Sequence, residues 1–270
     1  MSNYAFMDKI IMGFISTLAQ VGLYDINIKF LSIITPLVTS LSAVIQPRIA
    51  NIYAKGDDAK IKEYTTLTIK VMLFLTFPLI AILIGISDNL VQWLFKGEFL
   101  KLAFLIKITS PIILFLTVGS IFGTQILIPT GKEKDFTISL VIGAVVNVYF
   151  NFLLIPKYGA VGGCIAYALC QLSVSMYQFF VTKKYINLEE ISQDLWKYLV
   201  GAVIVFVSLS FVDKLQLSHL CILIVHLITA VLVYILATSL LKTDINIFLA
   251  SKVSEFIRGR EKELNENINI

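Results

Sequence analysis

Residues 136–181 contain two apolar blocks separated by a short turn. The chain reads FTISLVIGAVVNVYFNFLLI at positions 136–155, PKYG at 156–159 and AVGGCIAYALCQLSVSMYQFFV at 160–181. Neither block contains a charged residue. Each is long enough to cross the hydrocarbon layer of a bilayer, about 30 Å thick, as an α-helix. Because Pro and Gly end helices, this stretch predicts two membrane-spanning helices joined by a tight turn.

Six further apolar blocks flank this pair, which gives eight predicted spans. They occupy residues 4–23, 26–49, 67–86, 102–128, 198–212 and 220–241. Their apolar runs are continuous rather than alternating at every second residue, so α-helices are favoured over a β-barrel. With 57% hydrophobic and 15% charged residues, the chain has more apolar surface than one soluble core could bury. We therefore predict an all-α, polytopic membrane helix bundle of about eight transmembrane helices.

Basic residues lie mostly on one side of the predicted bundle. That side carries Lys9, Arg48, Lys55, Lys60, Lys62, Lys70, Lys132, Lys134, Lys183, Lys184, Lys197, Lys242, Lys252, Arg258, Arg260 and Lys262. By the positive-inside rule this side faces the cytoplasm, and an even number of spans places both termini there. Since the basic residues act as topology signals, the net charge of +4 implies no nucleic-acid partner.

The sequence lacks the motifs of most enzyme classes. It contains no GxxxxGK phosphate loop followed by Ser or Thr, no GxSxG and no HExxH, which are the patterns of nucleotide, acyl and zinc-dependent hydrolysis. Its cysteines and histidines do not have the spacing of a metal site. We therefore expect a protein that is not an enzyme and needs no metal ion or cofactor.

Polar residues inside the predicted spans are candidate functional residues, because such groups are costly in hydrocarbon. Lys29 follows Asp25 by one helical turn, a spacing that brings two side chains together. Lys29 either faces an aqueous cavity and binds an anionic headgroup, or extends to the interface and pairs with Asp25. Asn147 and Asn151 have the same spacing and either line a polar cavity or bind a neighbouring helix. Gln125 has the same two interpretations.

Several segments match, in order and spacing, the motifs of one transporter family. Asn147 to Ala166 resembles the pattern N-x-x-x-N-x-x-x-I-P-x-x-G-x-x-G-A-A-x-A, with Gly163 and Cys164 in place of two alanines. Similar matches occur at MDKIIMG (7–13), at VGLYDINIK (21–29), at Pro47-Arg48 and from Gln125 to Glu133. The chain thus resembles the polysaccharide-export flippases of the Wzx O-antigen type, within the multidrug and oligosaccharidyl-lipid exporter superfamily.

The resemblance implies a division of the chain, because members of this family resemble a pair of six-helix lobes that is often followed by two more helices. Residues 1–182 would form a six-helix C-terminal lobe, residues 183–241 two additional transmembrane helices, and residues 242–270 a cytoplasmic tail. The other half of the transporter would be a missing N-terminal lobe or a second copy of the chain.

The resemblance also implies a substrate and a place of action. The protein would translocate an undecaprenyl-diphosphate-linked oligosaccharide from the inner to the outer leaflet of the bacterial inner membrane, for O-antigen or capsule synthesis. Lys29 would bind the diphosphate or an acidic sugar, and Asp25 would hold Lys29 or relay a coupling ion. Asn147 and Asn151, and with them Gln125, would contact the sugar or brace the cavity wall.

Two alternatives stay open at this point. A multidrug exporter of the same superfamily would bind amphipathic cations, for which acidic rather than basic residues are expected inside the cavity. The intramembrane charges of this chain are mostly basic, apart from Asp25. The other alternative is a membrane half-protein that transports nothing.

Overall fold

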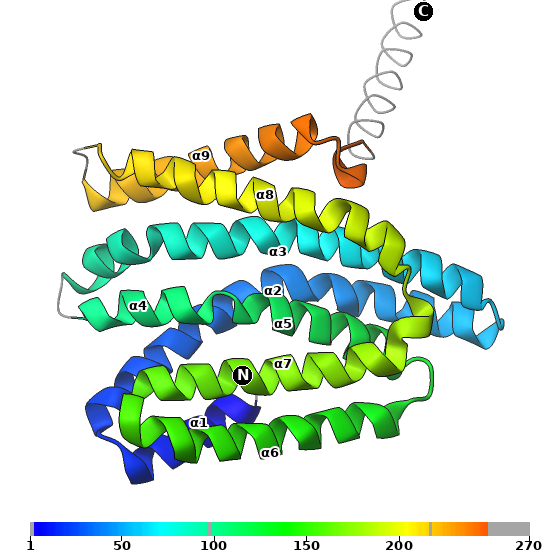
Figure 1. The fold of residues 1–270 in the computed structure, drawn as a ribbon, viewed down its shortest axis with the longest axis horizontal. Helices are drawn as coiled ribbons and strands as arrows, with labels where there is room; N and C mark the ends of the chain where they lie inside the picture. Colours follow the sequence, from blue (N-terminus) through cyan, green and yellow to red (C-terminus); the bar gives the residue numbers. More distant parts are fainter. Residues whose placement is uncertain (1–2, 97–98, 216–217, 248–270) are drawn as a thin grey trace, which may run out of the picture.

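The apolar blocks form long helices that lie side by side in one bundle (Figure 1). The computed structural model describes residues 3–96, 99–215 and 218–247. In chain order its elements are α1 (Asn3–Ile15), α2 (Leu18–Ala54), α3 (Asp58–Phe95), α4 (Leu100–Thr109), α5 (Ile112–Gly119), the π-helix η1 (Ser120–Leu127), α6 (Glu133–Tyr158), α7 (Ala160–Thr182), the 3₁₀-helix η2 (Lys183–Tyr185), α8 (Leu188–Val212) and α9 (His219–Leu240). The described residues contain no strand, which confirms the predicted all-α class.

Seven helical units within the described residues are long and apolar enough to cross a membrane. They are α2, α3, the unit from α4 through η1, α6, α7 with η2, α8 and α9. The prediction of a polytopic membrane bundle is thereby confirmed, and the seven units correspond to the second through eighth predicted spans.

The first predicted span, residues 4–23, does not form one helix. It is divided between α1 and the start of α2, because the Thr17 hydroxyl caps α2 by accepting a hydrogen bond from the Gln20 amide at 3.4 Å. With 13 residues, α1 extends about 20 Å, which is less than the hydrocarbon thickness. The described residues therefore supply seven candidate spans rather than eight. The expectation that both termini are cytoplasmic, as far as it relied on an even number of spans, has no support from them.

The connections lie at two opposite ends of the bundle (Figure 1). One end, called the basic end below, holds the α2–α3, η1–α6 and α7–α8 connections with Lys55, Lys132 and Lys183. We expected Lys9 on this side, and that expectation was wrong. Lys9 lies in the middle of α1, and its ammonium group contacts Asp25 of α2 at 2.8 Å.

The turn between α6 and α7 is shorter than the PKYG segment suggested. Helix α6 continues through Pro156 to Tyr158, and Gly159 alone joins it to α7 with φ at +56°. A side chain is strained in this backbone region, and glycine is not. The first amide of α7, at Ala160, donates to the Gln20 side-chain oxygen at 2.8 Å, which ties the turn to α2.

The last two helices are anchored to α3 at the basic end by ion pairs. The Lys70 side chain, 3% exposed, contacts Glu190 at 2.9 Å, Asp244 at 2.5 Å and Asp194 at 3.8 Å. Asp194 also pairs with Lys197 at 2.8 Å. The hydrogen bond from the Lys70 ammonium holds the pKa of the Asp244 carboxyl below its ordinary value. The segment directly after α9 is thereby fixed to α3 and α8, whereas residues 248–270 of the predicted tail lie outside the described residues.

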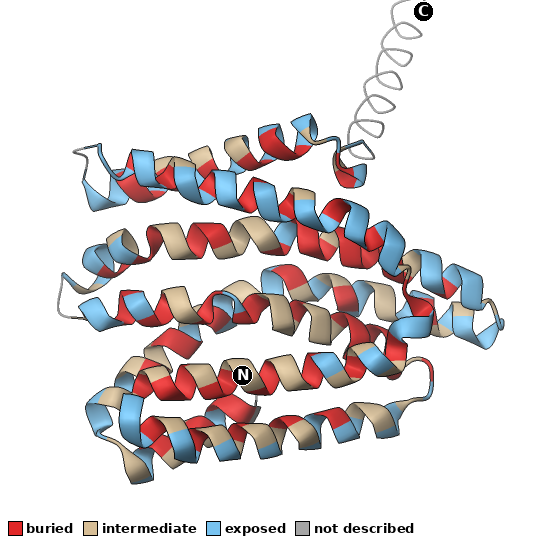
Figure 2. Ribbon diagram, in the orientation of Figure 1, coloured by how far each residue is buried: buried red, intermediate tan, exposed pale blue. Residues whose placement is uncertain are grey.

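Buried residues run along the facing sides of the helices (Figure 2). Most are apolar, and they form one cluster centred on α3, α8 and α9 and another among α1, α2, α5 and α7. Polar side chains are also fully buried between helices, among them Asp8, Asn27, Gln125, Asn147 and Asn151. Because each buried polar group needs a partner, the contacts of these residues define the candidate site.

Candidate functional site

The Asp25 carboxylate lies between two lysines from different helices. Its Oδ2 contacts the Lys29 Nζ at 2.8 Å, one turn along α2, and its Oδ1 contacts the Lys9 Nζ of α1, also at 2.8 Å. The Lys29 side chain is 62% exposed, Asp25 25% and Lys9 22%. The contact expected from the spacing of Asp25 and Lys29 is therefore present. Lys9 is a second partner that the spacing did not indicate.

A second carboxylate, Asp8, lies beside this group and is fully buried. Its Oδ1 accepts hydrogen bonds from the side-chain amides of Asn147 at 2.7 Å and Asn151 at 2.5 Å. Its Oδ2 accepts a hydrogen bond from the Tyr24 hydroxyl. The Asn151 amide also contacts the Asn147 oxygen at 3.1 Å. Asn147 and Asn151 thus bind the neighbouring helix α1, which was one of their two predicted roles.

The two carboxylates are connected through adjacent residues on both helices. Asp8 and Lys9 are neighbours on α1, and their respective partners Tyr24 and Asp25 are neighbours on α2. Successive residues of an α-helix point about 100° apart. The contact between Asp8 and Tyr24 therefore faces the interior and α6. The contact between Lys9 and Asp25 lies at the partly exposed edge where α1 meets α2.

Sequence reasoning did not select Asp8 as a site residue. The available signal was that a carboxyl group in hydrocarbon requires buried donors, and the pair Asn147 and Asn151 offered them. Sequence spacing could not show that these residues meet, because 139 positions separate Asp8 from Asn147.

Gln125 lies apart from both carboxylate groups. Its side chain is fully buried in η1, and neither its Nε2 nor its Oε1 has a hydrogen-bond partner among the described residues. π-Helical segments occur often at functional sites. Among the described residues, no hydrogen bond connects Gln125 with Asp25, Asn147 or Asn151. Four of the five predicted site residues therefore lie around α1 and α2, and the fifth does not.

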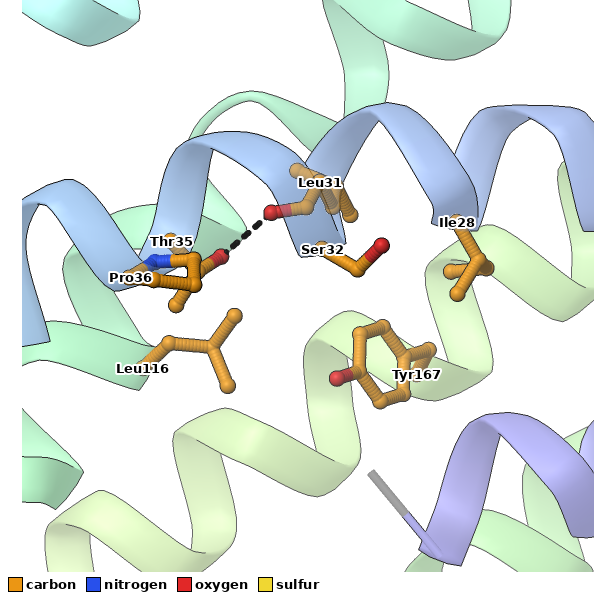
Figure 3. A pocket seen from close by; sticks show the side chains of 7 residues that line it. All are labelled: Ile28, Leu31, Ser32, Thr35, Pro36, Leu116 and Tyr167. Carbon is orange, nitrogen blue, oxygen red and sulfur yellow. Dashed lines mark hydrogen bonds between the residues drawn. The ribbon is translucent and has the colours of Figure 1, made fainter. Parts of the chain in front are cut away.

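A recess of about 180 Å³ lies between α2, α5 and α7, and its lining includes Ile28, the residue before Lys29. Figure 3 shows its lining residues, with Tyr167 directed from α7 toward α2. The Ser32 hydroxyl donates to the Lys29 carbonyl at 2.8 Å, and the Thr35 hydroxyl donates to the Leu31 carbonyl at 2.7 Å (Figure 3). Pro36 has no N–H to donate to the Ser32 carbonyl. The recess combines apolar side chains with the hydroxyl groups of Ser32, Thr35 and Tyr167, and Ser32 follows Lys29 by about one turn of α2.

This arrangement is suited to binding an anion with neighbouring hydroxyl groups. Within the described residues, no group of three or more His, Cys, Asp or Glu side chains is placed to hold a metal ion. The accessible charge of the site is the Lys29 ammonium, and ammonium groups bind phosphate as compact point charges.

Comparisons with known proteins show which family and which fold the chain matches. A family model described as the lipid II flippase MurJ matches residues 31–237. That range contains Gln125, Asn147 and Asn151 and begins just after Lys29. A solved structure of the lipid II flippase MurJ, in an inward closed conformation, superposes with a TM-score of 0.74 at 16% identity. The superposition covers 90% of this chain and 51% of that one, and it shows a shared fold.

Curated relatives match parts of longer proteins. An uncharacterized membrane protein of Methanocaldococcus jannaschii is 27% identical over 66% of this chain and 35% of its own length. A probable low-salt glycan biosynthesis flippase of Haloferax volcanii is 23% identical over 88% of this chain and 50% of its own. A capsular polysaccharide biosynthesis protein of Staphylococcus aureus is 27% identical over 52% and 36%. The chain therefore spans about a third to a half of the length of these relatives.

Proposed function

The chain belongs to the family of the lipid II flippase MurJ, and on this basis we propose that it takes part in moving a lipid-linked oligosaccharide across the membrane. The proposed substrate is an undecaprenyl-diphosphate-linked oligosaccharide used for a surface polysaccharide. It moves from the cytoplasmic to the outer leaflet of the bacterial inner membrane. Relatives named for glycan flipping and for capsular polysaccharide biosynthesis support this choice of substrate.

The chemistry of such a substrate defines what the protein must supply. Sugar hydroxyls and a diphosphate are too polar to enter hydrocarbon without compensating contacts, so the headgroup needs a polar, positively charged path. The polyprenyl chain can stay in the lipid beside the protein. Alternating access at a central site uses two lobes. We propose residues 1–182 as one lobe and residues 183–241 as two additional helices, with the other lobe supplied by a separate segment or a second copy.

The observation that carries the proposal is the exposed Lys29 ammonium, about one helical turn from the recess that Ser32 and Thr35 help to line. Lys29 binds the diphosphate or an acidic sugar, and the recess accepts adjoining sugar hydroxyls at Ser32 and Thr35. Asn147 and Asn151 support this site indirectly, because their amides hold α1 through Asp8. Their burial favours the bracing role over direct sugar contact.

The orientation follows from the charges of the connections. We place the basic end of the bundle in the cytoplasm by the positive-inside rule. The exposed Lys29 then lies nearer the outer side, because α2 begins at the end opposite to the basic end (Figure 1).

A multidrug exporter of the same superfamily is disfavoured by one feature of this site. Such a protein needs an acidic group free to bind organic cations. Both oxygens of Asp25 are already engaged by Lys9 and Lys29 at 2.8 Å.

Replacement of Lys29 by alanine tests the proposed function. In cells that depend on this protein, Lys29→Ala should abolish export of the polysaccharide and cause the lipid-linked oligosaccharide to accumulate, while the protein still inserts in the membrane. Lys107→Ala is the matched control, because Lys107 is a helical lysine paired with Asp88 at 2.5 Å, and it should leave export unchanged. Normal export by Lys29→Ala would refute the assignment, as would failure to accumulate the lipid-linked sugar.

A further inference from the structure

The ion pairs around Asp25 are not balanced in charge. One carboxylate lies between two ammonium groups, each 2.8 Å from a different carboxylate oxygen. The group formed by Lys9, Asp25 and Lys29 therefore has a net charge of +1, and the neighbouring Asp8 carboxylate is bound separately by neutral donors from α2 and α6. Without Lys9, the pair of Asp25 and Lys29 would be neutral.

The three side chains differ in how they can meet a ligand. Lys29 is 62% exposed and can turn toward an anion, whereas Lys9 is 22% exposed. Lys9 is also held by its surroundings, since its ammonium lies 5.9 Å from the centre of the Phe6 ring. Its neighbour Asp8 is fixed by hydrogen bonds from Tyr24 and α6. Lys9 therefore stays with Asp25 when Lys29 engages a ligand.

An anion that approaches Lys29 is also repelled by the negative charge of Asp25. A carboxylate one helical turn away repels a diphosphate and cancels most of the attraction of the lysine at longer range. A second cation on the far oxygen of Asp25 compensates that repulsion. The partly desolvated position of Asp25 and Lys9 limits screening by salt.

We infer that Lys9 is a positioning residue for anion recognition, which neutralises Asp25 so that Lys29 keeps its positive charge for the ligand. This inference rests on the proposed function, because it assigns Lys9 a role at the same site. The ligand chemistry is a phosphate or diphosphate ester. Lys9 acts through Asp25 and does not touch the substrate.

Binding of undecaprenyl diphosphate to the purified transporter, with its second lobe present, tests the inference. Uncharged undecaprenol serves as the reference ligand. Lys9→Met keeps most of the length of the side chain and removes its charge. It should weaken binding of the diphosphate about fivefold, the factor expected for one charge interaction at a partly exposed site. Binding of undecaprenol should not change.

A second substitution separates this role from a simple tie between helices. In the double variant Lys9→Met with Asp25→Asn, the ion pair between residues 9 and 25 is still missing, but Lys29 no longer has an adjacent carboxylate. Affinity for the diphosphate should return to within about twofold of wild type, as in a strongly coupled double-mutant cycle. Lys9→Arg should bind as the wild type does, because it keeps the charge.

The possible outcomes distinguish this inference from the proposed function. If Lys9→Met binds undecaprenyl diphosphate as tightly as wild type, the inference is wrong. It is also wrong if the double variant binds as weakly as Lys9→Met, since Lys9 would then serve only as a tie. Either result leaves the proposed function intact as long as Lys29→Ala abolishes export. Normal export by Lys29→Ala would instead refute the proposed function itself.

Discussion

Replacement of Asp8 by alanine should destabilise the bundle by about 2–6 kcal/mol. The value follows from the donors that would lose their acceptor. The Tyr24 hydroxyl and the Asn147 amide would each be left buried without a partner, whereas the Asn151 amide keeps the Asn147 oxygen at 3.1 Å. Each orphaned buried donor costs about 1–3 kcal/mol.

The isosteric variant Asp8→Asn should be less damaging. Its remaining oxygen can still accept from Asn147 and Asn151, but an amide nitrogen replaces the oxygen that accepts from Tyr24. The Tyr24 O–H then has no acceptor, but its oxygen can still accept from the new amide, so the expected loss is about 1–3 kcal/mol. The predicted order of stability is wild type, Asp8→Asn, Asp8→Ala.

Thermal unfolding of the purified chain in detergent measures this order. A loss of several kcal/mol should lower the melting temperature by about 5 °C or more. The control is Asp88→Ala, which removes a carboxylate that is 58% exposed and paired with Lys107. It should change stability by less than about 1 kcal/mol. If Asp8→Ala melts at the wild-type temperature, the donors find other partners and the reasoning fails.

Three further predictions concern packing and charge. Gly162→Ala would place a Cβ against a backbone carbonyl of α6 and should cost about 1–3 kcal/mol of stability. In Gly13→Ala the added Cβ meets nothing within 4 Å, so this variant should gain up to about 1 kcal/mol of helix stability. Equal shifts in the melting temperatures of the two variants would contradict this prediction. Lys70→Met should lower stability by about 1–3 kcal/mol because it removes two charge-assisted hydrogen bonds, and Lys60→Met on the exposed part of α3 should change it by less than about 1 kcal/mol. Because Lys70 lowers the pKa of Asp244, the stabilisation by this pair is complete above the ordinary carboxyl pKa of about 3.9 and is lost as the pH falls through the lowered value. Melting curves of wild type and Lys70→Met should therefore converge only in strong acid, and a difference that disappears already near neutral pH would oppose this account.

The spans could be predicted because the hydrophobic signal of a membrane helix is local. Each block in α2 to α9 is apolar over enough consecutive residues to identify it without knowledge of its neighbours. The first block was predicted wrongly because hydropathy does not register a cap. The Thr17 hydroxyl ends one helix and begins the next within an apolar stretch.

The candidate site was predictable only where its residues share a helix. Asp25 and Lys29 are one turn apart on α2, so their contact follows from helical geometry. The same rule paired Asn147 with Asn151 but could not identify what they bind. Gln125 illustrates the opposite case, because a buried amide without a partner among the described residues could not be inferred from sequence.

The sequence by itself determined that the chain is a helical membrane protein, which seven stretches are long and apolar enough to cross a bilayer, and at which end of the bundle most basic residues lie. These properties depend on composition over a single turn or a single span. Only the tertiary structure decided that Asp8 joins α1 to Asn147 and Asn151 on α6, and that Lys9 shares Asp25 with Lys29. Those contacts depend on how separate helices pack, and a buried carboxylate takes the donors that packing places around it.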